Sequence, residues 1–406
     1  MEFRTLLDAL RLICTLLPND DDAYQIHVAN QQCDGRRLTS ALLNHGRSPN
    51  SIADNLWHHL YRVYQMSTFL ITDGVSSLAE VTSSSGRISP ADGVTWQYAA
   101  VEFSQSKELM TIMLEWTTKI FENLLFPIRR YRPIPKSWKS SSSSRRSNSS
   151  RDSNVRSRMF ARDGEISPVG RAVDESAPED VLDSFAGRIA KLEAAHIMPF
   201  MLSKHSTMQT LLSMFAGTNM ESIIGGQSIN STSNIFCTDS ITHLNFDEFV
   251  IGVEYLNGQY RLRKVEPRRA RGPFMSQCQD GEEIIFGLGP QGYAIDLPDG
   301  ELFNIHLAIA NVLHASGAGE IINKVIQDEE DYNDGLVEDE AYASRILAFS
   351  LKMSLKRLQD VHSTESPLGG GGDSNTRQKG GVGILRVITL RWMHSCLKYN
   401  HFIPHY

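Results

Sequence analysis

The chain has 406 residues, of which 41% are hydrophobic and 21% charged, so it is long enough for two or three domains with cores of their own. A net charge of -7 excludes a positive field over the whole molecule, so any binding of nucleic acid or of an anionic membrane surface has to be local. The five cysteines are scattered without a C-x-x-C pair, which argues against a disulfide framework or zinc knuckle and favours a reducing compartment. No apolar run approaches the ~20 residues that cross a bilayer. We therefore expect an intracellular protein, cytoplasmic or nuclear, without a transmembrane segment.

Helical periodicity dominates the first part of the chain. Apolar residues within 3–17 recur on one face, opposite three charged side chains, which predicts an amphipathic helix rather than a signal peptide. Two more apolar stripes at helical spacing run over 52–63 and 109–124. We therefore predict a helical bundle over residues 1–128, closed by Pro127.

The composition then changes to a stretch rich in serine and arginine, which begins RRYRPIPKSWKSSSSSRRSNSS. It has almost no aliphatic residues to bury and cannot offset the entropy of ordering, so we predict a disordered linker over residues 129–176. Arginines precede Ser147 and Ser149 as basophilic kinases prefer, and a proline follows Ser167. These three serines are candidate phosphorylation sites, where phosphate would reverse the local charge.

Order is expected to resume in a second helical domain over residues 177–362. A capping-box pattern precedes an apolar stripe at helical spacing within 181–192, which predicts a helix. Two antiparallel hairpins are predicted within about 246–297, the first around the turn Asn257-Gly258. Two further helices are predicted at 302–314 and 341–358.

After the second domain, residues 363–383 read as a Gly-rich linker and residues 384–406 as a short apolar tail. The expected fold class is therefore mainly α: an N-terminal helical bundle, a disordered linker, and a second helical domain with a small antiparallel β insert.

Gly287, Gly289 and Gly292 have the G-x-G-x-x-G spacing of nucleotide-binding loops. In a dinucleotide fold these glycines open a helix, but here Pro290 interrupts and strand-like residues follow. A kinase loop would need a lysine on the next strand and downstream catalytic signatures, and neither is present. We interpret the motif as the turn of the second hairpin and predict no nucleotide cofactor.

No group of residues meets the spacing of a metal or catalytic site. The acidic run within 328–340 fails two ligand positions of a calcium loop, and the histidines near the C-terminus lack repeated short spacings. Other histidines have no matching nucleophile or carboxylate pattern. The sequence therefore predicts no catalytic residues, no metal and no cofactor.

Two basic clusters are candidate contacts for nucleic acid, or for nuclear import in the case of the first. Cations interleaved with aromatic residues can neutralise phosphates and stack on bases. The first cluster comprises Arg129, Arg130, Arg132, Lys136, Lys139, Arg145 and Arg146; the second comprises Arg261, Arg263, Lys264, Arg268, Arg269 and Arg271.

We interpret the chain first as a non-enzymatic interaction or scaffold protein. It would be a subunit of a larger assembly, with other proteins as partners and a linker regulated by phosphorylation. Two alternatives stay open. One is a nucleic-acid-binding or nucleocapsid-type protein in which both basic clusters face one groove. The other is an enzyme whose site is assembled from residues scattered along the sequence.

Overall fold

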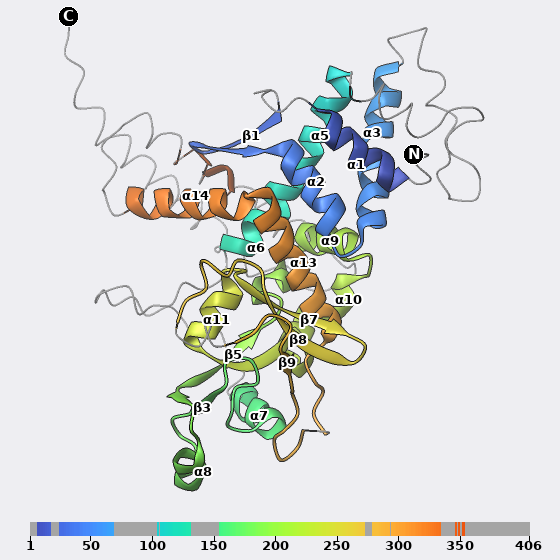
Figure 1. The fold of residues 1–406 in the computed structure, drawn as a ribbon. Helices are drawn as coiled ribbons and strands as arrows, with labels where there is room; N and C mark the ends of the chain where they lie inside the picture. Colours follow the sequence, from blue (N-terminus) through green and yellow to red (C-terminus); the bar gives the residue numbers. More distant parts are fainter. Residues whose placement is uncertain are drawn as a thin grey trace, which may run out of the picture. The chain divides into compact units, whose positions relative to one another are not determined.

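The structure is a computed structural model that describes residues 6–17, 24–68, 104, 106–130, 154–272, 278–292 and 294–333, with six positions between 346 and 353. The chain divides into a compact unit, Met1–Thr364, and a second unit, Glu365–Tyr406. The predicted linker at 363–383 and tail at 384–406 lie outside the described residues. Among the described residues helices predominate, and the sheets have two or three strands (Figure 1), as expected for a mainly α protein with small antiparallel sheets.

The N-terminal region contains α1 (Leu6–Leu16), α2 (Gly35–His45), α3 (Pro49–Thr68) and α5 (Lys107–Ile120), with a hairpin of β1 (Gln25–Val28) and β2 (Gln31–Asp34) between α1 and α2. Helix α2 begins where it does because the Asp34 carboxylate accepts the Arg37 N–H at 2.9 Å, satisfying a first-turn donor. The buried hydroxyls of Thr39 and Thr117, 2.6 Å apart, join α2 to α5. The hairpin is an addition to a region that we expected to be helical throughout.

Pro127 does not end the helical segment. Helix α5 continues into a π-helical turn, η2 (Phe121–Leu125), and then into α6 (Phe126–Arg130). In the wide turn the Phe126 N–H bonds to the Phe121 carbonyl, five residues back. Proline lacks an N–H and crowds the carbonyl four residues before it, so a wide turn just ahead of Pro127 relieves the conflict.

From residue 154 onward, helices alternate with short strands. The helices are α7 (Asn154–Asp163), α8 (Glu179–Ser184), α9 (Ser206–Ala216), α10 (Met220–Ile224), α11 (Ser240–Asp247), α13 (Gly300–Ser316) and α14 (Ala318–Asn333), with short 3₁₀ turns η4 (Phe200–Lys204), η5 (Gly226–Asn230) and η6 (Thr232–Asn234). The strands are β3 (Ala172–Asp174), β4 (Arg188–Ala190), β5 (Leu192–His196), β6 (Ile235–Asp239), β7 (Ile251–Leu256), β8 (Gln259–Lys264) and β9 (Glu283–Ile284).

The first predicted hairpin is confirmed. Strands β7 and β8 pair antiparallel around Asn257 and Gly258, whose φ angles of 53° and 82° are those of a turn with two left-handed residues. Strand β9 extends this sheet to three strands. Elsewhere β3 pairs with β4 in parallel, and β5 pairs with β6 antiparallel.

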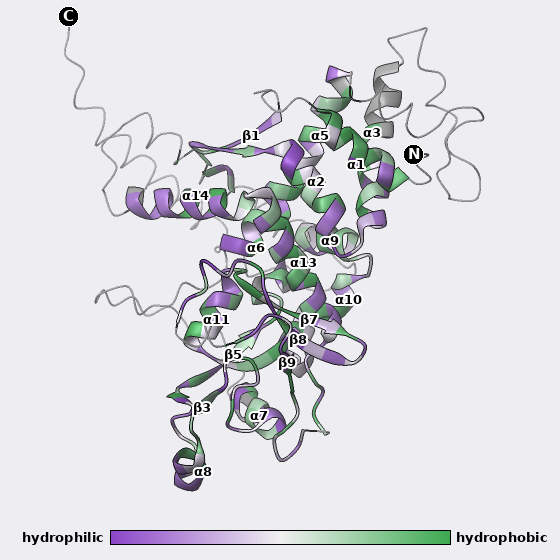
Figure 2. Cartoon of the chain, viewed as in Figure 1, coloured by the Kyte–Doolittle hydropathy of each residue, from purple (hydrophilic) through white to green (hydrophobic). Residues whose placement is uncertain are grey.

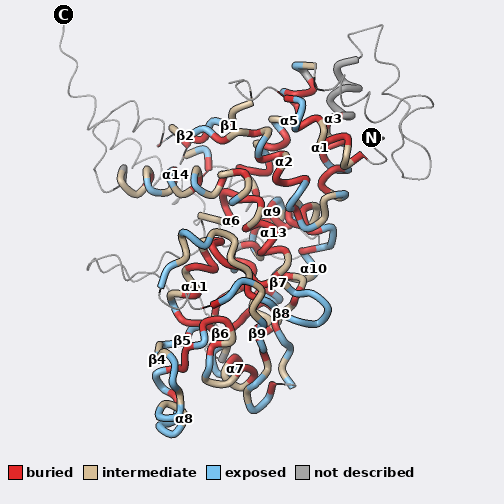
Figure 3. The backbone as a smooth tube through the Cα atoms, viewed as in Figure 1, coloured by how far each residue is buried: buried red, intermediate tan, exposed pale blue. Residues whose placement is uncertain are grey.

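The helix predicted over 181–192 is wrong beyond its first turns. Helix α8 ends at Ser184, and β4 and β5 occupy the rest of the stripe. None of the residues of α8 is buried, as Figure 3 shows, so no apolar face holds a longer helix in place. Leu192 is buried in the sheet instead.

Part of the predicted linker is folded. Residues 131–153 lie outside the described residues, but within 154–176 the chain forms α7 and β3. Met159, Ala172 and Val173 in this stretch are buried, and Met159 packs with β5 and β6 in a small apolar cluster. These few apolar residues are enough to fold the segment, because they pack against strands from a later part of the chain.

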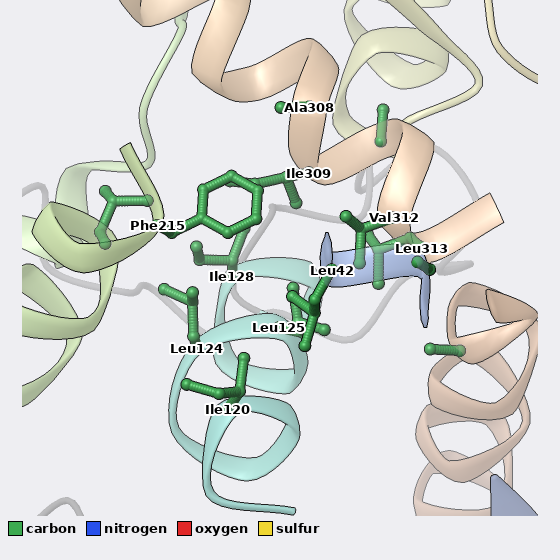
Figure 4. Packing of buried hydrophobic residues seen from close by; sticks show 14 of the residues in the cluster. Leu42, Ile120, Leu124, Leu125, Ile128, Phe215, Ala308, Ile309, Val312 and Leu313 are labelled. Carbon is green, nitrogen blue, oxygen red and sulfur yellow. The ribbon is translucent and has the colours of Figure 1, made fainter. Parts of the chain in front are cut away.

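One hydrophobic cluster runs from α1 to the last described residues and has α13 at its centre. Figure 4 shows Ile309 and Val312 of α13 beside Leu42 of α2, Leu125 of η2 and Phe215 of α9. Colouring by hydropathy places apolar residues along these contacts and polar residues on the outer side of α14 (Figure 2). The N-terminal helices therefore share a core with the later ones, where we expected two domains, because periodicity marks a buried face but not its partner.

Among the described residues, no single helix is long and apolar enough to cross a membrane. Helices α13 and α14 pass that test only together, as a pair bent by 85°. Most residues of α13 are buried within the protein core, which accounts for its apolar composition.

Candidate functional site

Strands β5 and β6 and helix α11 form a compact β-β-α unit. The two strands pair antiparallel, with Leu192 opposite Asp239 and His196 opposite Ile235, and α11 follows β6 without a loop. The helix can begin at once because the buried Asp239 carboxylate accepts the N–H groups of Ile241 and Thr242. The Arg188 guanidinium lies 2.7 Å from the same carboxylate and balances its charge.

His243 of α11 lies between two carboxylates. Its Nδ1 is 2.6 Å from Oε1 of Glu193 on β5, and its Nε2 is 3.3 Å from Oδ2 of Asp247, one turn further along the helix. Only a doubly protonated imidazole presents an N–H in both directions, so this geometry favours the imidazolium form. The side chain is 18% exposed, so solvent and a ligand can reach it.

His196 is placed by the residue before β6. The carbonyl of Asn234 accepts the Ile197 N–H at 2.8 Å, and its side-chain Oδ1 accepts the Met198 N–H at 2.8 Å. The amide nitrogen of Asn234 donates back to the Met198 carbonyl and to that of Ile229, at 3.2 and 2.9 Å. Asn234 is buried with its hydrogen-bonding groups used, so it fixes the backbone directly after His196.

The imidazole of His196 is oriented as well. Its Nε2 lies 3.1 Å from Oδ1 of Asn230, and its ring packs against Phe200 at a centroid distance of 6.3 Å. An amide oxygen only accepts, so Nε2 carries the proton and donates. In the neutral ring the unprotonated nitrogen is then Nδ1, which is able to take a proton from a substrate or water.

A fully buried ion pair supports this unit from outside. Arg162 and Asp163, at the end of α7, form two hydrogen bonds of 2.9 and 2.7 Å with each other. The guanidinium also donates to the carbonyl groups of Thr232 and Ile235, on either side of Asn234, and to that of Asp296. Because a buried charge without partners is very costly, this network holds the start of β6 firmly in place.

The N–H groups of the glycine motif donate to the C-terminal end of α7. The N–H groups of Gly289 and Gln291 each donate at 2.7 Å to carbonyl groups in the last turn of α7, and the Gly287 N–H donates to Asp163 at 3.1 Å. A Cβ on Gly289 would lie 2.5 Å from the Gly164 nitrogen, so only glycine allows the approach. The predicted second hairpin is wrong: among the described residues of 285–299 none forms a strand, because these N–H groups cap α7.

The candidate phosphorylation sites divide between described and undescribed parts of the chain. Ser147 and Ser149 lie outside the described residues. Ser167 is fully buried; its hydroxyl donates to the Cys237 carbonyl at 3.3 Å and accepts the Gly170 N–H at 2.8 Å. A kinase requires an exposed hydroxyl, so the fold argues against modification of Ser167.

The first basic cluster is mostly beyond the described residues, which include only Arg129 and Arg130 of it. The Arg129 guanidinium donates to the Asp247 carbonyl at 3.2 Å, at the end of α11. Arg130 pairs with Glu329 at 2.8 Å. Arg129 therefore contacts α11, whereas Arg130 contacts α14.

The second basic cluster separates into two groups. On the hairpin, Arg263 pairs with Glu254 and Asp280 at 3.1 and 3.3 Å, and Arg261 donates to Gln259. After the hairpin, Arg268, Arg269 and Arg271 lie on a segment that runs beside α11. The sequence placed all of these residues together, but the fold brings only the second group to the β-β-α unit.

Cysteine and metal chemistry have little support in the described part of the chain. Burial raises the pKa of the Cys14 and Cys33 thiols to about 12 and that of Cys278 to about 11, so these thiols stay protonated and unreactive. No group of three or more His, Cys, Asp or Glu side chains there is arranged to hold a metal ion. Glu193 and Asp247 lie at opposite nitrogens of His243.

Comparison with known proteins adds one match. Residues 177–254 are similar to the HNH endonuclease family, a span of 78 of the 406 residues. No curated protein and no solved structure matches the chain. The matched span contains β5, β6 and α11, and it agrees with the nucleic-acid alternative better than with the interaction protein that we placed first.

Sequence reasoning missed the residues that the fold brings together here. His196 is separated from Asn234 by a long stretch with five helical segments, and the three residues share no short sequence motif. Each residue had a local signal. His196 lies at the end of a strand-like run, Asn234 lies directly before a second strand-like run, and His243 lies in the helix that follows that second run. Only the pairing of β5 with β6 connects them.

Proposed function

We propose that the β5–β6–α11 unit acts on nucleic acid and hydrolyses phosphodiester bonds. The observation that carries the proposal is the placement of His196, Asn234 and His243, whose order matches the letters of the HNH family name, in one β-β-α unit within the matched span. The hydrogen bonds of Asn234 to the backbone after His196 support it, because a catalytic histidine needs a fixed position.

His196 is the proposed general base. With Nε2–H directed to Asn230, its Nδ1 lone pair can take a proton from the water that attacks phosphorus. The bond from phosphorus to the leaving oxygen then breaks, and solvent or a protonated group returns a proton to that oxygen. His243, whose ring is held between Glu193 and Asp247, is proposed to help position the nucleic acid on α11.

The test is cleavage by the full chain of labelled duplex DNA, single-stranded DNA and RNA, each with magnesium and with a chelator. Changing His196→Ala should lower the cleavage rate by about 10²–10⁴-fold, the usual contribution of a general base. His27→Ala, which removes an exposed histidine on β1, is the matched control and should leave the rate unchanged. If the wild-type chain cleaves none of these substrates, the proposed hydrolysis is wrong.

A second candidate is binding of nucleic acid without cleavage. It is favoured by His243, whose two ring nitrogens both face carboxylates. In that case the wild-type chain would retard nucleic acid in a gel but leave its length unchanged, and His196→Ala would bind as well as wild type.

A further inference from the structure

The C-terminal end of α11 collects arginines from two distant parts of the chain. The guanidinium of Arg129, in the last turn of α6, donates to the carbonyl of Asp247 at 3.2 Å. Arg271, which follows β8, pairs with Glu248 at 3.0 Å. Both residues lie outside the span that is similar to HNH endonucleases.

The segment containing Arg271 is anchored on α11 and not merely near it. The side-chain amide of Asn245 accepts the Arg271 N–H at 2.8 Å and donates to the Arg271 carbonyl at 2.9 Å, and Asn245 is fully buried. Gly272 follows with a φ of +88°, and a Cβ there would lie 2.8 Å from Ile241 of the same helix. The position of this segment relative to His243 is therefore fixed.

The anchored segment presents arginines to solvent. Three of the four residues Arg268–Arg271 are arginines; Arg268 is exposed and the Arg271 side chain is 48% exposed. Arg269 pairs with Glu266 and Arg271 with Glu248, so three guanidinium groups face two carboxylates. No described residue pairs with Arg268. The planar, multidentate donor set of arginine suits phosphate oxygens.

The distance between the anchored arginine segment and His243 suits the spacing of phosphates along a nucleic-acid strand. Asn245 lies two residues after His243, so it projects from nearly the opposite side of α11. The anchored segment is thus about one helix diameter, ~10 Å, away from the histidine. A nucleic-acid strand with one phosphodiester at His243 has its neighbouring phosphates within that range.

We infer that Arg268 and Arg271, held on α11 by Asn245, contact the phosphodiester backbone of the nucleic acid on which the β5–β6–α11 unit acts. This inference rests on the proposed function and specifies how the substrate is held. The contacts read no sequence, since a phosphate is the same at every step. They fix the position of the backbone relative to His196 and His243.

The experiment measures binding of the full chain to labelled duplex DNA, single-stranded DNA and RNA by fluorescence anisotropy over a salt series. Combining Arg268→Ala with Arg271→Ala should reduce the slope of log affinity against log salt by roughly 1.8 for duplex and 1.4 for single strands. The dissociation constant should rise about tenfold or more, to a similar extent for all sequences. The preferred substrate among the three identifies the kind of nucleic acid.

Arg158→Ala is the control, because it removes an exposed positive charge on α7. Both variants should keep the wild-type melting temperature; Arg268→Ala alone, which breaks no ion pair with a described residue, guards against a folding defect in the double variant. Because the control removes one charge and the double variant two, a loss in the control of half that in the double variant or more would show a net-charge effect and overturn the inference. If wild type binds or cleaves nucleic acid but the double variant matches it, the inference fails alone. If wild type neither binds nor cleaves nucleic acid, the proposed function fails too.

Discussion

Leu42, Phe215 and Ile309 belong to one buried apolar cluster around α13 (Figure 4). Arg162, Asp163 and Asn234 are just as buried, but each is held by hydrogen bonds: Arg162 and Asp163 to each other, and Asn234 to the backbone of Met198. In the first region any side chain of the right volume satisfies the site. In the second region each donor needs its own acceptor. Removing either partner leaves the other buried without a hydrogen bond. The core around α13 therefore gives stability, while the network beneath β6 fixes particular atoms in particular places.

The largest effect is expected at the buried ion pair. Changing Asp163→Ala should lower the free energy of unfolding by about 3–5 kcal/mol, because it leaves the Arg162 charge buried without a counter-charge. Denaturant unfolding measures this. Asp280→Ala breaks a surface pair with Arg263 and should cost within about 1 kcal/mol. Similar costs for the two variants would mean that the buried network is not special.

The apolar region should respond to volume and not to chemistry. Leu42→Ala should lower the free energy of unfolding by about 3 kcal/mol, through lost burial and the cavity that remains beside α13. Leu42→Met, which keeps the volume, should cost less than about 1.5 kcal/mol. If methionine is as damaging as alanine, the core depends on exact shape and the contrast with the polar network weakens.

The glycine loop lies between these two extremes. Gly289→Ala should destabilise the protein by about 1–3 kcal/mol, since the new Cβ would overlap backbone atoms of α7. Gly319→Ala is the matched control in α14, where a Cβ meets only ordinary contacts, and should be neutral or stabilising by up to ~1 kcal/mol. Calorimetry with ATP and NAD should detect no binding to either variant or to wild type. Saturable binding that Gly289→Ala abolishes would contradict the capping role of this loop.

The smallest effect appears only in acid. Burial alone would raise the pKa of the Asp174 carboxyl, but hydrogen bonds from Ser176, the Leu192 N–H and Arg156 hold it below the ordinary value of 3.8. A depressed pKa in the folded state contributes stability that is present above the unfolded value and is lost as the pH falls through the folded value. Melting temperatures between pH 2 and 7 should therefore show a shallower acid decline for Asp174→Asn than for wild type. The exposed neighbour Glu175→Gln should keep the wild-type decline; if both variants follow it, Asp174 contributes nothing to the acid sensitivity.

Sequence reasoning succeeded where a structure depends on neighbouring residues. The turn at Asn257-Gly258 follows from two adjacent residues that tolerate positive φ, and the helix predicted at 302–314 is the middle of α13. It failed where the partner is distant. The stripe within 181–192 gave no sign that Leu192 would join a strand with Asp239, and nothing near Gly289 pointed to the carbonyl groups of α7.

The candidate site was missed for the same reason. Residues of one site are readily recognised in a sequence when they share a short motif, but His196 and His243 are brought to one unit only by strand pairing. The basic clusters were recognised, since charge is a local property. Which arginines would meet α11 depended on Asn245, a buried amide that no pattern singled out.

The support that α7 and the glycine loop give to β6 limits how the β-β-α unit can be transplanted. A fragment trimmed to 177–254 would lose Arg162 and Asp163 at one end and Arg271 at the other, although Ile235 and Asn245 depend on them. A portable version has to begin before α7 and extend past Gly292. Even then Phe246 and His306 would be parted unless α13 is retained, because their rings stack 3.7 Å apart. In this chain the β-β-α unit is embedded in a larger fold. The residues that hold it in place come from sequence segments on both sides of the matched span.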